Sequence, residues 1–275
     1  MQLAFTTLGC PGWDLDTIIA RAVDYGYQGV DFRGYLDDVD ITARPEFTTR
    51  AAETARKFSD AGLVVPCFSS SCHAFCPTRE RKAESLDELR RYAELCAAFN
   101  APYIRIFGGG IGETSRPRAV SMAAETLTEL AAAAAEYDLT IVFETHDDWT
   151  AALDVRALLA ATQADNVAVL WDTHHPYRMD GEDPAETCRI LGTWIQYTHW
   201  KDSRPDASAQ HGYHLCMFGD GDLPLNDMLA ALRGVGYDGW LTLEWELRWH
   251  PDLDAPELAF PRYAEEMRRL LAETE

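Results

Sequence analysis

Residues 167–175, VAVLWDTHH, contain an unbroken apolar run that ends in one aspartate and two histidines. The run has the length and the β-branched content of a strand that is buried on both faces. Residues 139–146, LTIVFETH, and residues 194–199, WIQYTH, repeat the pattern, and helix-length segments separate the three. Strands that alternate with helices indicate a parallel sheet whose strands are joined by crossover helices.

The same alternation extends outward from this region to both ends of the chain. We expect strands at residues 3–6, 29–32, 63–68, 103–107, 139–143, 167–171, 194–198 and 240–243. Eight such units, without a glycine-rich dinucleotide motif after the first strand, favour a closed barrel over a doubly wound sheet. The prediction is an α/β protein in which residues 1–275 form a single (β/α)8 TIM barrel domain.

The composition indicates a chain that avoids anionic partners. Its 275 residues carry a formal net charge of −21, with 47% apolar and 25% charged residues, and no run of lysine and arginine interrupts the acidic balance. Such a chain repels the phosphate backbone of nucleic acids and anionic membrane surfaces. We therefore expect no nucleic-acid partner and no membrane association.

The cysteines and the first residues favour a cytoplasmic setting. There are seven cysteines, an odd number, and none of them forms a CxxC motif, so reduced thiols are expected. The opening residues 1–5, MQLAF, lack the basic and apolar regions of a secretory signal. No segment reaches 18 uncharged apolar residues, which excludes a transmembrane helix.

Four polar residues follow the apolar runs of the second half, and each is a type that binds metal ions. Glu144, Asp172 and His199 are 28 and 27 positions apart, which is one β/α repeat each time, and Glu244 follows the last expected strand. The carboxyl ends of barrel strands share one rim, so the four side chains can point at one place. The alternative for any one of them is that it caps the next helix or faces the solvent.

A set of carboxylates with a single imidazole indicates the kind of cation. Such a ligand set is typical of sites for Mn²⁺, Mg²⁺ or Co²⁺, and it differs from a structural zinc site, which is built from thiolates. We expect one divalent metal ion, with Mn²⁺ as the first choice and Mg²⁺, Co²⁺ or Zn²⁺ as alternatives. A separate zinc site at Cys72, His73 and Cys76 is disfavoured by its spacing.

Several segments resemble one known family. WDTHH (171–175), YTHWKDS (197–203), FGDGD (218–222) and LTLEWELRWHPD (241–252) are similar to the sugar phosphate isomerase/epimerase superfamily, and so is GCPGWDLDTIIARAVDYGYQGVDFR (9–33). The superfamily includes xylose isomerase-like barrels, ketose 3-epimerases and inositol-pathway isomerases and dehydratases. The resemblance spans the whole chain and is specific for the superfamily, but it does not select the substrate.

The resemblance also implies roles for particular residues. The implied metal ligands are Glu144, Asp172, His199 and Glu244. His175 matches a histidine that contacts substrate, and Lys201 with Asp202 matches a lysine–aspartate pair that follows the histidine ligand. In the 3-epimerases the two metal-bound glutamates also exchange protons with the substrate. Those enzymes carry a further arginine after strand seven, with which Arg204 does not align.

Other residues are candidates for substrate contact from their positions alone. His146 neighbours an expected ligand, His73 follows the third expected strand, and Arg105 lies within the fourth. His174 also neighbours an expected ligand, where it would support that ligand or only pack. Each has a plain structural alternative: packing for the histidines, and a salt bridge that lines the barrel for Arg105. Aromatic residues near the strand ends are candidates for walls of a sugar site: Trp13, Phe68, Trp171, Trp200 and Trp245.

The expected activity is that of a metal-dependent isomerase or epimerase acting on a small sugar, keto-sugar or polyol. A metal bound to a carbonyl and the neighbouring hydroxyl stabilises an enediolate, and Glu144 and Glu244 are the expected acid/base pair. Loss of a hydroxyl would instead make the protein a lyase or dehydratase on a keto-sugar or keto-inositol. More distant alternatives are an endonuclease IV-like DNA repair enzyme, disfavoured by the charge, and a non-catalytic sugar-binding barrel. Association into a homo-oligomer is left open.

Overall fold

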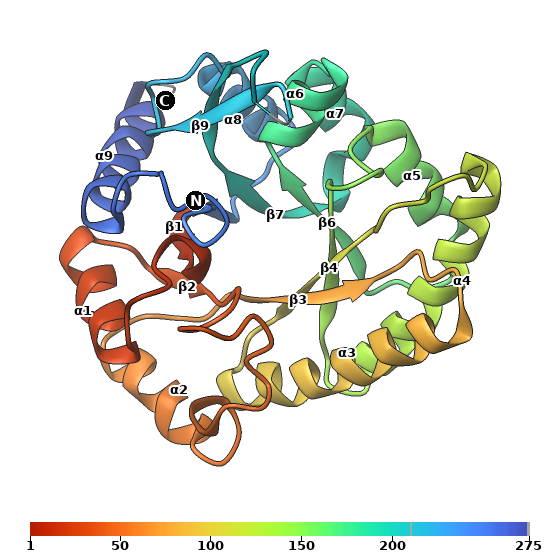
Figure 1. The fold of residues 1–275 in the computed structure, drawn as a ribbon, viewed down its shortest axis with the longest axis horizontal. Helices are drawn as coiled ribbons and strands as arrows, with labels where there is room; N and C mark the ends of the chain where they lie inside the picture. Colours follow the sequence, from red (N-terminus) through yellow and green to blue (C-terminus); the bar gives the residue numbers. More distant parts are fainter. Residues whose placement is uncertain (210, 274–275) are drawn as a thin grey trace.

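Eight parallel strands form the central sheet, in the order β2-β1-β10-β7-β6-β5-β4-β3. The computed structural model describes residues 1–209 and 211–273. The barrel strands are β1 (Gln2–Thr6), β2 (Gly29–Asp31), β3 (Cys67–His73), β4 (Tyr103–Phe107), β5 (Thr140–Glu144), β6 (Val167–Asp172), β7 (Ile195–Trp200) and β10 (Trp240–Leu243). Figure 1 looks along the barrel, with these strands in the middle of the molecule.

The two end strands of this sheet, β2 and β3, meet through isolated bridges. Gly29 pairs with Val64, and Phe32 pairs with Phe68, both in parallel orientation. These bridges bring the sheet back on itself, so the predicted (β/α)8 barrel is confirmed as a nearly closed barrel.

Helices surround the strands on the outside of the barrel (Figure 1). They are α1 (Leu15–Tyr25), α2 (Ala51–Asp60), α3 (Arg79–Phe99), α4 (Arg116–Ala135), α5 (Ala152–Ala161), α6 (His174–Asp180), α7 (Pro184–Leu191), α8 (Leu225–Gly234) and α9 (Pro256–Glu273). Short 3₁₀ turns occur at Thr7–Gly9, Pro45–Phe47 and Gly192–Trp194. Within the described residues, none of the helices is long and apolar enough to span a membrane.

Helix α1 shows how the sequence sets an element's limits. The Asp14 side chain accepts a hydrogen bond of 2.8 Å from the Thr17 backbone N–H and so caps the helix N-terminus. Gly26 ends the helix in a left-handed conformation with φ of 74°, which glycine adopts without steric cost. Ile18 and Ala22 face inward and are fully buried, which anchors the helix on the barrel.

Two hydrophobic clusters fill the molecule. The larger lies between the strands and the surrounding helices, and the smaller comprises Cys67, Val142, Ala168, Leu170 and Tyr197. The residues of the smaller cluster come from the barrel strands β3, β5, β6 and β7 and are buried. The interior of the barrel is therefore packed, as in other barrels of this kind, and polar groups gather above it at the rim.

The structure differs from the sequence prediction in two places that shape the rim. The third strand begins at Cys67 rather than at residue 63, because Pro66 has no N–H to donate to a ladder, and it continues to His73. Between β7 and α8, where the sequence analysis predicted no strand, the chain forms a two-stranded antiparallel sheet of β8 (Asp202–Pro205) and β9 (Tyr213–Cys216).

Candidate metal centre and active site

The four expected metal ligands lie together at the carboxyl ends of the strands. Glu144 ends β5, Asp172 ends β6, His199 lies near the end of β7, and Glu244 follows β10 directly. The register pairs His199 with Asp172 on one side and with Thr242 on the other. One ligand atom from each of the four residues lies within 4.8 Å of the other three, and all four residues are buried.

His199 occupies the middle of this group. Its Nδ1 is 3.2 Å from Oε1 of Glu144 and 3.2 Å from Oε1 of Glu244. Burial lowers the pKa of His199, but Glu244, Asp31 and Glu144 outweigh it and raise that pKa well above its usual range. The arrangement thus favours positive charge between Nδ1 and the two carboxylates, which is where a cation bound by these atoms would lie.

Two buried carboxylate oxygens in the group accept no hydrogen bond of good geometry among the described residues, and each lies in an ion pair instead, with Nε of Arg105 at 3.2 Å and with Nζ of Lys201 at 2.7 Å. They are Oε2 of Glu144 and Oδ2 of Asp172. Burial, opposed by Lys201 and reinforced by Glu244, raises the pKa of Asp172 to about 7. The same burial acts on Glu144, but there Arg105 and His199 hold the pKa below its usual range. A buried set of three carboxylates and one imidazole, whose ligand atoms lie within 4.8 Å of one another, fits a hard divalent cation.

Lys201 is buried and surrounded by carboxylates. Its Nζ lies 2.7 Å from Oδ2 of Asp172 and 2.8 Å from Oε1 of Glu246, and it also bonds to Oε2 of Glu244. Burial lowers the pKa of Lys201, but Asp172, Glu244 and Glu246 raise it well above its usual range. A permanently charged ammonium here orients two of the expected metal ligands.

A cavity of about 590 Å³ opens beside this group. Its lining includes Arg33, Arg105, His146, His175, Glu244 and Trp249. Its size suits a small molecule, and its position at the carboxyl ends of the strands is the place where barrel enzymes bind their substrates. Of the two expected acid/base residues, only Glu244 lines the cavity, and Oε2 of Glu144 faces Nε of Arg105 at 3.2 Å.

The structure places the five expected substrate contacts in different surroundings. His146, His175 and Arg105 line the cavity, whereas Lys201 is not among its lining side chains. His73 lines a separate cavity of about 450 Å³. Burial, reinforced by the charge of Lys201, lowers the pKa of His175 well below its usual range, so a neutral imidazole faces the cavity. The roles of these five residues toward substrate stay predictions.

The aromatic residues expected to wall a sugar site lie elsewhere. They pack in the core between strands and helices: Trp13, Phe68, Trp171, Trp200 and Trp245. Phe107 and Trp249 line the cavity in their place. The expectation fails because aromatic side chains near strand ends are more often needed to cover the barrel than to face its rim.

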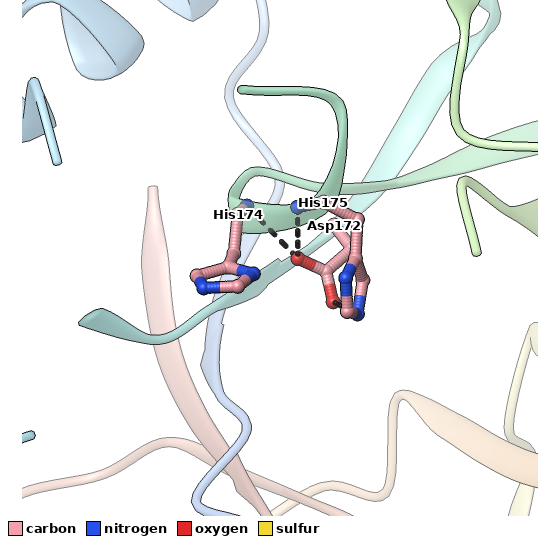
Figure 2. A group of neighbouring side chains, drawn as sticks. All are labelled: Asp172, His174 and His175. Atoms are coloured by element: carbon pink, nitrogen blue, oxygen red, sulfur yellow. Dashed lines mark hydrogen bonds and ion pairs between the residues drawn. The ribbon is translucent and has the colours of Figure 1, made fainter. Parts of the chain in front are cut away.

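A second group with metal-binding side chains shares Asp172 with the first. It consists of Asp172, His174 and His175, which follow one another around the start of α6. Oδ1 of Asp172 accepts hydrogen bonds from the backbone N–H groups of His174 (2.9 Å) and His175 (3.4 Å), as Figure 2 shows. The Nε2 atom of His174 is already bonded to Oγ of Ser203 at 2.9 Å, which leaves this group less free than the four-residue group to bind a cation.

Two residues that matter to the site were missed by the sequence analysis. Oδ2 of Asp31, at the end of β2, lies 3.2 Å from Nε2 of His199 and holds the ring from the side opposite to the ligand group. Arg33 follows two residues later and lines the cavity. A signal was present in residues 29–33, GVDFR, because an acidic and a basic residue interrupt an otherwise apolar strand.

Asp202, the partner of Lys201 in the expected pair, supports a loop. Its Oδ2 accepts hydrogen bonds from the backbone N–H groups of Gly219 (3.0 Å) and Gly221 (2.9 Å). A Cβ atom at Gly221 would lie 1.8 Å from Oδ1 of Asp202, so this close approach requires glycine. The FGDGD segment is thus tied to the end of β7 beside the site.

We call Glu144, Asp172, His199 and Glu244 the rim cluster. The fold and the rim cluster place the chain among (β/α)8 barrels whose polar site lies at the carboxyl ends of the strands. The family model described as xylose isomerase-like TIM barrel matches residues 19–273, and the chain belongs to that family. The resemblance to sugar isomerases and epimerases found in the sequence is confirmed at this level.

Individual relatives point to more than one activity. An inosose dehydratase from Lacticaseibacillus casei is 32% identical over 136 residues, which cover 44% of this chain and 45% of that protein. A fructoselysine 3-epimerase from Escherichia coli O157:H7 is 25% identical over 284 residues, and the match covers 100% of this chain and 100% of that protein. The IolI protein, solved with a bound zinc atom, superposes with a TM-score of 0.80 at 16% identity, covering all of this chain and 98% of that one.

Proposed function

We propose that the chain is a divalent-metal-dependent isomerase or epimerase, which moves a proton at the carbon beside the carbonyl of a small sugar-like substrate. The observation that carries the proposal is the buried group of Glu144, Asp172, His199 and Glu244, whose ligand atoms lie within 4.8 Å of one another beside a cavity. Mn²⁺ is the first choice for the cation, and the zinc atom in the IolI protein keeps Zn²⁺ among the alternatives.

The cation and the glutamates have separate tasks in this proposal. A divalent cation held by the four residues supplies Lewis-acid polarisation of a carbonyl and its neighbouring hydroxyl. Glu244 lines the cavity and takes or returns the proton on the face of the substrate that it meets. Glu144 serves the opposite face, and the guanidinium of Arg105 at its Oε2 favours its anionic form until the proton arrives.

The remaining side chains position the substrate and the carboxylates. His175 is neutral and buried beside Asp172, so its imidazole can bond a hydroxyl without adding charge to the site. Lys201 keeps the carboxylates of Asp172 and Glu244 in place. If the proton returns to the same carbon from the other face, the substrate is epimerised; if it returns to the adjacent carbon, an aldose and a ketose interconvert.

A dehydratase is the second candidate, because one of the relatives is an inosose dehydratase at 32% identity over less than half of the chain. The first step would be the same proton abstraction, and a hydroxyl would then leave with a proton from a neighbouring acid. His146 lines the cavity, and its Nδ1 is 2.9 Å from Oδ1 of Asp147, so it is the side chain best placed for that transfer.

One experiment separates these reactions. The purified chain, loaded with Mn²⁺, is incubated in D₂O with a panel of ketoses and keto-inositols, and the products are followed by NMR. An isomerase or epimerase incorporates deuterium at the carbon beside the carbonyl and keeps the oxygen count of the substrate. A dehydratase releases water. Isomerised or epimerised product without deuterium at that carbon would contradict the first form of proton transfer, and turnover with neither deuterium uptake nor loss of water would contradict both forms.

A further inference from the structure

Arg105 has unused hydrogen-bonding capacity at the cavity. It is fully buried on β4, and none of its three guanidinium nitrogens makes a hydrogen bond within the described residues. Its Nε lies 3.2 Å from Oε2 of Glu144, and its Cζ lies 3.7 Å from the centre of the Phe107 ring. A buried guanidinium with unfilled N–H groups is costly unless a ligand supplies acceptors.

Arg33 approaches the same ring without a direct ion-pair partner among the described residues. It is 8% exposed, its Nη1 donates to Oγ of Ser71 at 2.9 Å, and its Cζ lies 5.7 Å from the Phe107 ring centre. Residues 1–209 and 211–273 offer it no ion-pair partner. Burial, and after it the positive charge of Arg105, lowers the pKa of Arg33 to about 10, which places the two cations close to one another.

The other charged groups around the cavity already have partners. Lys201 contacts three carboxylates, and Arg105 contacts one. Of the two further acids that line the cavity, Asp147 bonds His146 and the Gly109 N–H, and Asp148 accepts from the Ile111 N–H. Arg33 is therefore the one cation lining the described cavity that has no carboxylate within ion-pair distance, so its guanidinium is open to a carboxylate of the ligand.

We infer that the substrate carries a carboxylate, which Arg33 and Arg105 bind beside the Phe107 ring. The substrate class is a polyhydroxy keto acid, and the keto end of that molecule rests on the proposed function. The two guanidiniums offer the forked N–H donors that match a planar carboxylate. A phosphate dianion is disfavoured, because Glu244, Glu246, Asp147 and Asp148 line the same cavity and repel two negative charges more strongly than one.

The test uses a matched pair of small molecules and the full chain loaded with Mn²⁺. 5-Keto-D-gluconate and L-sorbose differ only in a terminal carboxylate in place of a hydroxymethyl group, and L-sorbose 6-phosphate supplies the phosphate arm. Isothermal titration calorimetry gives each dissociation constant. Because hydrogen bonds to charged groups are worth about 1.5–3 kcal/mol, we expect roughly ten- to a hundredfold tighter binding of the carboxylate compound than of L-sorbose.

Variants locate the source of this preference. Arg33→Gln should remove most of it, and Arg33→Lys should keep part, because lysine retains the charge without the fork. Arg118→Gln is the control: this exposed arginine on α4 lies outside the cavity lining, and its replacement makes the same charge change. Thermal unfolding and metal content confirm that each variant is folded and loaded. A carboxylate preference that stays undiminished in Arg33→Gln would overturn the inference.

The wild-type comparison decides the matter even if the Arg33 variants do not fold. Equal affinity for the carboxylate compound and L-sorbose, or tighter binding of the phosphate, overturns the inference. Failure of the proposed function looks different, because it removes deuterium exchange and turnover but leaves the carboxylate preference in binding. Exchange on neutral ketoses without any carboxylate preference would leave the proposed function standing and the inference refuted.

Discussion

Replacement of Asp31 by asparagine should weaken metal binding, although it leaves all four proposed ligands in place. Oδ2 of Asp31 lies 3.2 Å from Nε2 of His199, and its Oδ1 accepts a 2.8 Å hydrogen bond from Oγ of Ser69. Both carboxylate oxygens thus accept from donors on other strands, β7 and β3. This pairing favours the tautomer of His199 that carries its proton on Nε2 and offers the lone pair of Nδ1 to a cation.

The Asp31→Asn variant can satisfy only one of these two donors. Its single carbonyl oxygen must face either Ser69 or His199, and its amide group then points donors at the other. If the amide faces His199, the ring moves its proton to Nδ1 and loses the ligand lone pair. Loss of such a partner costs about 10- to 100-fold in metal affinity, equivalent to roughly 1.4–2.7 kcal/mol. We expect a loss in that range.

Mn²⁺ affinity can be measured by competition with a chelating dye, on variants whose folding is checked by circular dichroism. Asp16→Asn is the matched control, because Asp16 is exposed on α1 and pairs with Lys57, so the same charge is removed from a residue that pairs with no expected metal ligand. Wild-type Mn²⁺ affinity in Asp31→Asn would refute the argument that Asp31 fixes the His199 ring. A loss of equal size in Asp16→Asn would show that net charge alone is responsible.

Further predictions concern catalysis, metal removal and packing. Glu244→Gln should lower turnover by roughly 10²–10⁴-fold, whereas Glu246→Gln, which removes another Lys201 partner, should lower it much less. Equal losses in the two variants would argue against Glu244 as the proton carrier. Chelation should lower the unfolding free energy by about 2.7 kcal/mol if the metal had been present at 100 times its dissociation constant, and an unchanged melting temperature would count against a bound ion. Gly108→Ala should cost about 1–3 kcal/mol, because its Cβ would meet Trp149 at 2.0 Å; Gly110→Ala, with its nearest neighbour at 3.7 Å, should cost little, and similar unfolding free energies for both would disprove this.

The rim cluster could be predicted from the sequence because parallel strands bring their carboxyl ends to one edge. Glu144, Asp172 and Glu244 each stand directly after or at the end of an apolar run, so the alternation alone placed them at the same level. The barrel followed from the same alternation. Metal binding by these residues is the proposal that their geometry supports.

Contacts across the barrel could not be predicted in this way. Asp31 and His199 are 168 positions apart, and their strands β2 and β7 are not neighbours in the sheet. Their contact depends on side-chain directions inside the barrel, and the periodicity of apolar residues in the sequence does not predict these directions. Arg33 was missed for a related reason, since a charged residue after a strand is usually solvated, and only the packed ring of Phe107 shows where its guanidinium lies.

The most direct test of the central claim is a crystal structure of the chain grown with Mn²⁺, with the ion located by its anomalous scattering. We predict one strong anomalous peak per chain, from an Mn²⁺ ion that is bound by Glu144, Asp172, His199 and Glu244. A peak at Asp172, His174 and His175 in its place, or no peak at the rim when Mn²⁺ is in excess, would contradict the account.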